Sequence, residues 1–173
     1  LEEGLARSRK NGMRKIEESY EKVTFSEGEG RYSEKKVAED YIEAVSERFD
    51  VDISVAANYG NGVMGVIGPE ILEKIGCEVK NVNEEVDGEF PNHLADPTKE
   101  EAQKALKDEM TDEDLGILFD GDGDRAGFIY DREYISEDEV LALFSQRILE
   151  EKSGKVVHDL RASKLVKEKI REK

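Results

Sequence analysis

The sequence has little of three features that mark large classes of proteins: cysteine, long apolar runs and positive charge. Cys77 is the single cysteine, so no disulfide framework can form, which fits a reducing cytosol and predicts a cytoplasmic protein. No apolar run approaches membrane-spanning length and nothing resembles a signal peptide. We therefore expect no membrane partner.

The shortage of positive charge bears on the partners that the chain can take. Lysine and arginine number 26 against 42 aspartates and glutamates, which gives a net charge of −16. Such a chain repels polyanions, so nucleic acid and anionic membranes are poor partners. An anionic substrate would need a local source of positive charge. Charged residues make up 39% of the 173 residues and apolar ones 37%, which predicts a modest core and solvated helix surfaces.

From residue 34 onward, stretches with strand-like and helix-like spacing alternate. Up to residue 135 we expect a helix that begins at Ser33 as its N-cap, strand 52–57, helix 63–75, strand 78–82, helix 99–110, and strands 115–119, 126–130 and 132–135. Pro69 favours a regular helix that starts there, and Gly76 favours its end. The alternation predicts α/β layers. The sixteen residues 83–98 form a long polar loop, which is typical of a functional segment.

The two flanking regions differ from this central part. Residues 1–33 are expected to form a charged helical segment and a linker rich in glycine at 27–31. Residues 132–173 predict an incomplete second α/β unit, with a helix capped by Ser136, a strand at 155–158 and a helix from Ala162. The helix after Ser136 is amphipathic, with an inner face made of Val140, Leu141, Leu143, Phe144, Ile148 and Leu149.

The strongest chemical signal is the stretch 120–125, with the sequence Asp-Gly-Asp-Gly-Asp-Arg. Carboxylates at alternate positions of an extended backbone project to one side, and the glycines let the chain bend around an ion. Three such groups repel one another unless a cation lies among them, and hard oxygen ligands select Mg²⁺, Mn²⁺ or Ca²⁺. Arg125 adds donors for an oxyanion such as phosphate. The stretch therefore predicts a site for a divalent metal and a phosphate.

Two other interpretations of this stretch remain open. Aspartate and glycine are common in solvated turns, although a turn needs one or two of them. An EF-hand loop would use Asp120, Asp122 and Asp124 as its first ligands, but it requires glycine at its sixth position and usually glutamate at its twelfth. Arg125 and Asp131 stand there, and the preceding residues are typical of a strand.

Three motifs in order resemble the α-D-phosphohexomutases, the phosphoglucomutase and phosphomannomutase family. These are the Gly-Asn-Gly turn within 58–62, the Phe-Pro-Asn-His sequence at 90–93, and the acidic loop at 120–125. The resemblance implies that 34–131 is the family's second domain, a three-layer mixed sheet with helices on both faces. It implies that 1–33 is the tail of the first domain and 132–173 the incomplete start of the third.

The resemblance also implies roles for particular residues. Asp120, Asp122 and Asp124 would bind Mg²⁺, whose fourth protein ligand in the family is a phosphoserine of the first domain. Arg125 would contact the transferring phosphoryl group. Arg161 would lie near a basic cleft position of the third domain. The intact enzyme would interconvert hexose 1- and 6-phosphates through a bisphosphate intermediate.

Other polar residues near these motifs fit structural roles better than catalytic ones. His93 could act as a general base, since histidine titrates near neutral pH, but a hydrogen-bonding role in its loop is preferred. His158 ends an expected buried strand and is interpreted as a core histidine. The turn at 58–62 could cradle a phosphate, and a simple strand-to-helix turn is preferred.

The family's phosphoserine motif, sugar-recognition loop and distal phosphate-binding loop do not occur in these 173 residues. We therefore expect this chain alone to be inactive and to depend on missing domains, in cis or on a partner chain, for its hexose phosphate substrate. The alternative is a free-standing, non-catalytic module for a metal or phosphosugar. The sequence does not distinguish glucose, mannose and glucosamine phosphates.

Overall fold

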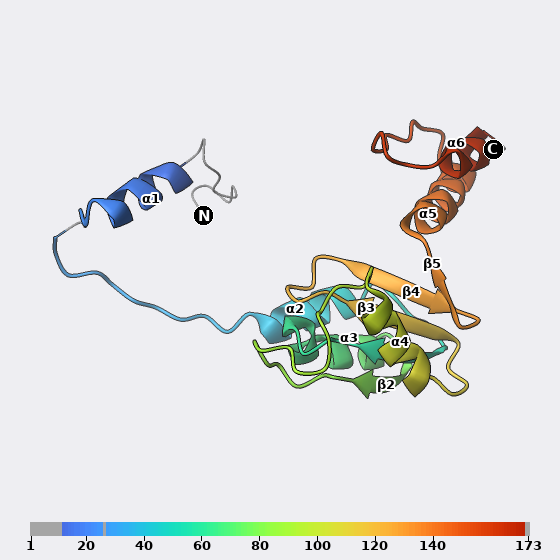
Figure 1. Ribbon diagram of the computed structural model, residues 1–173, viewed down its shortest axis with the longest axis horizontal. Coiled ribbons are helices and arrows are strands. Elements are labelled where there is room, and N and C mark those ends of the chain that lie inside the picture. Colours follow the sequence, from blue (N-terminus) through green and yellow to red (C-terminus); the bar gives the residue numbers. More distant parts are fainter. Residues whose placement is uncertain (1–11, 26, 172–173) are drawn as a thin grey trace. The chain divides into compact units, whose positions relative to one another are not determined.

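The computed structural model describes residues 12–25 and 27–171 in two units, which divide between Lys36 and Val37 (Figure 1). The first unit contains α1 (Met13–Glu21), and the rest of its described residues form no further helix or strand. This agrees with the expected helix and glycine-rich linker, although residues 1–11 of that prediction lie outside the described part. The second unit carries every strand of the described residues.

The second unit is built on one five-stranded mixed sheet with the strand order β2-β1-β3-β4-β5 (Figure 1). The strands β1, β2 and β3 are parallel, and β4 and β5 continue the sheet in antiparallel pairing. Their bounds are Ser54–Asn58 (β1), Glu78–Val82 (β2), Leu115–Phe119 (β3), Ala126–Tyr130 (β4) and Glu133–Ile135 (β5). Because β1 and β3 are parallel neighbours, their carboxyl ends lie side by side, and the residues that follow Asn58 and Phe119 meet there.

Helices cover both faces of this sheet, as predicted. Alternate residues of a strand point to opposite faces, so Ala56 and Leu118 pack against the buried residues of α4 (Glu100–Glu109), Ala102 and Leu106. On the other face, a second buried cluster is made of Val55, Cys77 and Ile117, and Leu72 and Ile75 are among the half-buried residues packed against it. The three-layer α/β architecture is therefore confirmed.

The helix expected over 63–75 is divided in two. A 3₁₀ helix, η2 (Val63–Val66), precedes α3 (Gly68–Lys74). Pro69 lies in the first turn of α3, as predicted, because a proline there removes no intrahelical hydrogen bond. Gly76 follows the helix with a φ of +100°, a left-handed conformation that favours glycine.

The predicted start of the first helix at Ser33 is wrong. The helix α2 (Ala38–Ser46) begins after Val37, and no side chain caps its first turn. The sequence offered only half of a capping box at 33–36, since Lys36 stands where the box needs glutamate. Without that reciprocal hydrogen bond, the helix begins where its own apolar positions, such as Ile42, can be buried.

The last segment agrees with the prediction in part. Ser136 caps α5 (Glu137–Glu151) through a complete capping box with Glu139, and α6 (Lys164–Arg171) follows. The strand predicted at 155–158 is wrong: these residues form no strand, and Val157 is 94% exposed. A strand requires a neighbour for its backbone N–H and C=O groups, and the described residues supply none there.

The inner face predicted for α5 is also wrong in part. Its buried residues are the small Ala142 and Ser145, whereas Leu143, Phe144 and Ile148 are exposed. The helix packs against α6, where Val166 is buried. Within residues 12–25 and 27–171, no helix has the length and apolar character needed to cross a membrane.

Candidate metal centre

The acidic loop 120–125 connects β3 to its antiparallel neighbour β4. The loop is closed by a hydrogen bond from Asp120 N to the carbonyl oxygen of Arg125 at 3.2 Å, and Gly123 N donates to Asp120 O at 3.2 Å. Gly123 has a φ of +74°, which an L-residue with a side chain rarely adopts. Because strands flank the loop on both sides, the EF-hand interpretation, which needs helices there, is wrong.

The three aspartates of this loop converge. One carboxylate oxygen from each of Asp120, Asp122 and Asp124 lies within 4.8 Å of the other two, which is close enough for one ion to contact all three. Asp120 is fully buried, whereas Asp122 and Asp124 are exposed. Carboxylate oxygens are the hard ligands that Mg²⁺ and Ca²⁺ prefer, so the acidic loop could bind a divalent metal ion.

The electrostatics of the loop are those of crowded negative charge. The neighbouring carboxylate of Asp122 raises the pKa of Asp124, and Asp120 adds to the effect. Burial by itself would raise the pKa of Asp120, but hydrogen bonds from the backbone and the guanidinium of Arg125 hold that pKa below its usual value. The loop therefore holds negative charge that a cation would neutralise.

Arg125 already supplies part of that neutralisation. Its backbone N–H donates to Asp120 Oδ1 at 3.0 Å, and its Nε donates to Asp120 Oδ2 at 2.7 Å. Both oxygens of the buried carboxylate thus accept hydrogen bonds from one residue. The Nε also lies 3.5 Å from Asp124 Oδ1, and Nη1 lies 3.8 Å from Asp96 Oδ1. The arginine side chain is 61% exposed, so the guanidinium remains accessible to an anion.

Two other segments fix the backbone of the acidic loop. Gly121 N donates to the carbonyl oxygen of Ala95, in the 83–98 loop, at 3.2 Å, and Gly121 O accepts from Val63 N at 3.1 Å. The backbones of Gly62 and Gly121 pack directly together, since a Cβ at position 62 would lie 2.8 Å from Gly121 O. The 58–62 turn, the 83–98 loop and the acidic loop, which carry the three motifs found in the sequence, are therefore in contact with one another.

The turn 58–62 has no free backbone N–H groups with which to cradle a phosphate. Gly60 N donates to the side chain of Asn58, Asn61 N donates to the carbonyl of Asn83, and Gly62 N donates to the carbonyl of Tyr59. A phosphate site at a helix start needs such groups to be available. The geometry favours the simpler interpretation, a tight turn that supports the acidic loop.

His93 lies in a buried network of amide side chains. Its Nδ1 lies 3.0 Å from the carbonyl oxygen of Leu94, so Nδ1 carries the proton, and Nε2 accepts from Asn58 Nδ2 at 3.0 Å. Asn58 Oδ1 accepts a further hydrogen bond from Asn83 Nδ2 at 3.2 Å. Both ring nitrogens are thus used, which favours the structural role predicted for His93. No sequence pattern indicated Asn83, whose partners lie 25 and 10 residues away.

Arg161 lies in the turn before α6, and its hydrogen bonds are made within that turn and not with the acidic loop. Its Nε pairs with Asp159 Oδ1 at 2.9 Å and its side chain is 91% exposed. Within the described residues it forms no salt bridge with the aspartates of the loop 120–125. It lines a hollow of about 400 Å³ with Asp138 and Leu141 of α5. His158 is half-buried and outside any strand, and its Nδ1 bonds the carbonyl of Asp159, so its predicted place at the end of a strand is wrong.

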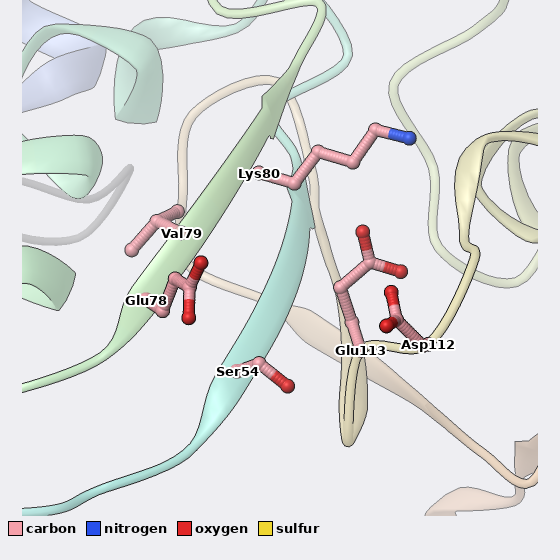
Figure 2. Close-up of a pocket in the computed structure, with 6 residues that line it drawn as sticks. All are labelled: Ser54, Glu78, Val79, Lys80, Asp112 and Glu113. Carbon is pink, nitrogen blue, oxygen red and sulfur yellow. The ribbon is translucent and has the colours of Figure 1, made fainter.

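Another hollow, of about 230 Å³, lies toward the amino ends of β1 and β2, and Figure 2 shows the residues that line it. Ser54 and Glu78 line it where β1 and β2 begin, and Asp112 and Glu113 line it from the loop before β3. Its cation, Lys80, bonds the carbonyl oxygen of Glu109 and lies 3.5 Å from the carboxylate of that residue. A hollow lined by acids, with its lysine already paired, is poorly suited to a phosphorylated ligand.

Comparison with known proteins gives consistent results. A family model described as phosphoglucomutase/phosphomannomutase, alpha/beta/alpha domain II, matches residues 39–133. A phosphomannomutase/phosphoglucomutase of Pseudomonas putida is 34% identical over 142 residues, which are 79% of this chain and 31% of that protein. A probable phosphoglucosamine mutase of Methanopyrus kandleri is 36% identical over 138 residues, 76% of this chain and 30% of that protein.

The solved structures agree. A phosphoglucomutase/phosphomannomutase family protein from Burkholderia thailandensis superposes with a TM-score of 0.76 at 28% identity, over 90% of this chain and 36% of that one. The chain thus spans about a third of the length of the curated relatives it matches. These comparisons do not favour the alternative of a free-standing, non-catalytic module for a metal or phosphosugar. The range matched by the family model includes the acidic loop and both segments that support it, and the chain belongs to the phosphoglucomutase/phosphomannomutase family.

Proposed function

We propose that this chain supplies the metal-binding part of a phosphohexomutase that interconverts hexose 1- and 6-phosphates. The observation that carries the proposal is the convergence of three carboxylates within 4.8 Å beside an accessible guanidinium. The metal is Mg²⁺, which is bound by hard oxygen ligands and commonly acts with substrate phosphates. Asp120, Asp122 and Asp124 hold it.

The residues of the loop divide the work of phosphoryl transfer. When bound, Mg²⁺ draws negative charge from the oxygens of the transferring phosphoryl group. Arg125 orients that group through its planar donors and stabilises the charge on its oxygens. Burial of Asp120 keeps one ligand fixed, so that little rearrangement is needed when the ion binds. Arg161 is proposed as a further substrate contact.

The proposal assigns a place in the larger enzyme to each region. Residues 34–131 are the metal-binding domain, 1–33 the end of the preceding domain and 132–173 the start of the following one. The nucleophilic phosphoserine and the loops that select the sugar belong to the rest of the enzyme. This chain alone is therefore inactive, and addition of a polypeptide that carries the missing domains is expected to restore mutase activity with glucose 1-phosphate, glucose 1,6-bisphosphate and Mg²⁺.

A calorimetric titration tests the metal site directly. Asp122→Asn removes one charged ligand and should weaken Mg²⁺ binding by tenfold or more, equivalent to at least about 1.4 kcal/mol. Asp131→Asn is the matched control, because Asp131 is also exposed, follows the neighbouring strand β4 and has a φ of +49°, which asparagine tolerates. Equal affinities of Asp122→Asn and the unsubstituted chain would refute the proposed site.

A further inference from the structure

The carboxylate of Asp96 is held in place by residues of its own segment, independently of the acidic loop. Its Oδ1 accepts hydrogen bonds from Thr98 N at 3.0 Å and from Thr98 Oγ1 at 2.8 Å. The backbone around it is also fixed, since Asp96 N donates to Leu94 O and Lys99 N donates to Asp96 O. Its side chain is 21% exposed. Asp96 therefore presents a charge whose position is set by the 83–98 loop and the start of α4.

The guanidinium of Arg125 is held between this carboxylate and Asp120. Nε donates to Asp120 Oδ2 at 2.7 Å, and Nη1 lies 3.8 Å from Asp96 Oδ1. The two contacts use different nitrogens of one planar group and come from different segments of the chain. The first contact is a hydrogen bond and the second an ion pair at a longer distance, so together they restrict the orientation of the plane more than one contact would. Among the described residues, Nη2 donates no hydrogen bond.

We propose that Asp96 is a positioning residue for Arg125. By holding Nη1, it keeps Nε on Asp120 and leaves Nη2 as the donor presented to an oxyanion of the substrate. The inference rests on the proposed function for its purpose, but the geometry that it predicts exists without metal or substrate. The 83–98 loop thus contributes to the site through one charge as well as through the backbone contact between Ala95 and Gly121.

Nuclear magnetic resonance of the arginine side chain tests this in the metal-free chain. The Nε–H signal of Arg125, assigned by its loss in Arg125→Lys, should exchange slowly with water because it donates to buried Asp120. In Asp96→Asn the amide oxygen can still accept from Thr98, but the charge that faces Arg125 is gone. We expect exchange of the Arg125 Nε–H to accelerate at least fivefold, while the backbone amide spectrum stays native.

Asp87→Asn is the matched control. Asp87 lies in the same loop, and its Oδ1 accepts from Glu89 N at 2.9 Å in the same kind of turn. Among the described residues it forms no salt bridge. Exchange in this variant should match that of the unsubstituted chain. A rate in Asp96→Asn within twofold of the unsubstituted chain, with native amides, would overturn the inference.

A second variant covers the case in which Asp96→Asn does not fold. Thr98→Val keeps the charge of Asp96 but removes the hydroxyl that fixes it. Exchange of the Arg125 Nε–H that accelerates at least fivefold would then support the inference, and exchange within twofold of the unsubstituted chain would overturn it. The outcome is separate from the proposed function. If the unsubstituted chain fails to bind Mg²⁺ while Asp96→Asn loosens Arg125, the metal site is wrong and the positioning role stands. If the unsubstituted chain binds Mg²⁺ and Arg125 is unaffected in Asp96→Asn, the metal site stands and the positioning role is wrong.

Discussion

Asp120 and Asp122 are two residues of one type, two positions apart, whose surroundings in the acidic loop differ. Asp120 is buried and bonded through both oxygens to Arg125, while Asp122 is exposed. A buried carboxylate requires a partner, and the arginine provides it independently of any ion. In the proposed metal site, the fixed carboxylate would set the position of the ion, and the exposed carboxylates could adjust to it.

Gly62 is a residue of the 58–62 turn at which even the smallest side chain should be destabilising. In Gly62→Ala the new Cβ would meet Gly121 O at 2.8 Å and Gly121 Cα at 3.0 Å, both of which are backbone atoms that cannot rotate away. We expect a loss of about 1–3 kcal/mol in the free energy of unfolding, measured by urea denaturation.

Gly88→Ala is the control for this substitution. A Cβ at position 88 meets nothing within 4 Å, so the free energy of unfolding should change by less than about 1 kcal/mol. Equal stabilities of the two alanine variants would mean that the contact between the 58–62 turn and the acidic loop does not hold the site together.

The acidic trio could be predicted from the sequence because its members are neighbours with a regular spacing. The supports of the trio could not. Asn58 and His93 are 35 residues apart, and Asp96 and Arg125 are 29 apart. Hydrogen bonds between single polar side chains leave no periodic pattern, so only the folded chain shows which of its many asparagines and aspartates meet.

At the scale of elements, β1 and β3 are fastened at their amino ends by Asp114 and Ser54. Asp114 Oδ2 accepts from Ser54 N and Ser54 Oγ, each at 2.8 Å. The backbone N–H of Ser54, with help from its hydroxyl, holds the pKa of Asp114 below its usual value. This contribution to stability is therefore complete above the unfolded pKa, about 3.9, and is lost as the pH falls through the lower folded pKa.

Asp114→Asn should consequently be less stable than the unsubstituted chain at pH 7. The difference between them should shrink as the pH is lowered from about 5 to about 3, because the unsubstituted chain loses the carboxylate there. Urea denaturation at a series of pH values measures it. A pH-independent difference for Asp114→Asn would contradict the interpretation.

The capping box of α5 allows a second test at this scale. Ser136→Ala removes the hydroxyl that accepts from Glu139 N, and loss of such a cap costs about 1 kcal/mol. Hydrogen exchange of the amides in the first turns of α5 should then accelerate about fivefold. Ser153→Ala, outside the helices, should leave these rates unchanged. Unaltered exchange in Ser136→Ala would show that packing alone holds the helix.

Most elements of the sheet could be predicted, because burial on two faces imposes a pattern on every strand and helix. Two of the predictions that were wrong, at Ser33 and at 155–158, fall where that constraint is weak. Half a capping box does not compete with the burial of Ile42, and an apolar run forms a strand only beside another strand. Neither condition can be judged from the run itself.

At the scale of the whole molecule, a net charge of −16 makes the chain sensitive to cations in two ways. Any salt screens the general repulsion, whereas a metal that binds the acidic loop adds a specific contribution. At a Mg²⁺ concentration of a hundred times its dissociation constant, that contribution is about 2.7 kcal/mol.

Thermal unfolding in MgCl₂ and in NaCl at matched ionic strength separates the two effects. We expect a higher melting temperature in MgCl₂, and this excess should vanish in Asp122→Asn. The excess should also shrink as the pH falls, because protonation of Asp124, whose pKa is raised by the neighbouring carboxylates, weakens metal binding. An equal shift of the melting temperature in both salts would mean that charge screening alone stabilises the chain and that no specific metal site contributes.

The hairpin formed by β3 and β4 carries all three aspartates within five consecutive residues. Closing so short a segment costs little chain entropy, so pairing of these strands is an early event available to the unfolded chain. Charge repulsion then accumulates in the nascent hairpin before the supports from the 58–62 turn and the 83–98 loop arrive. A dissolved cation that relieves this repulsion would therefore assist the folding pathway, well before a finished site exists for it to occupy.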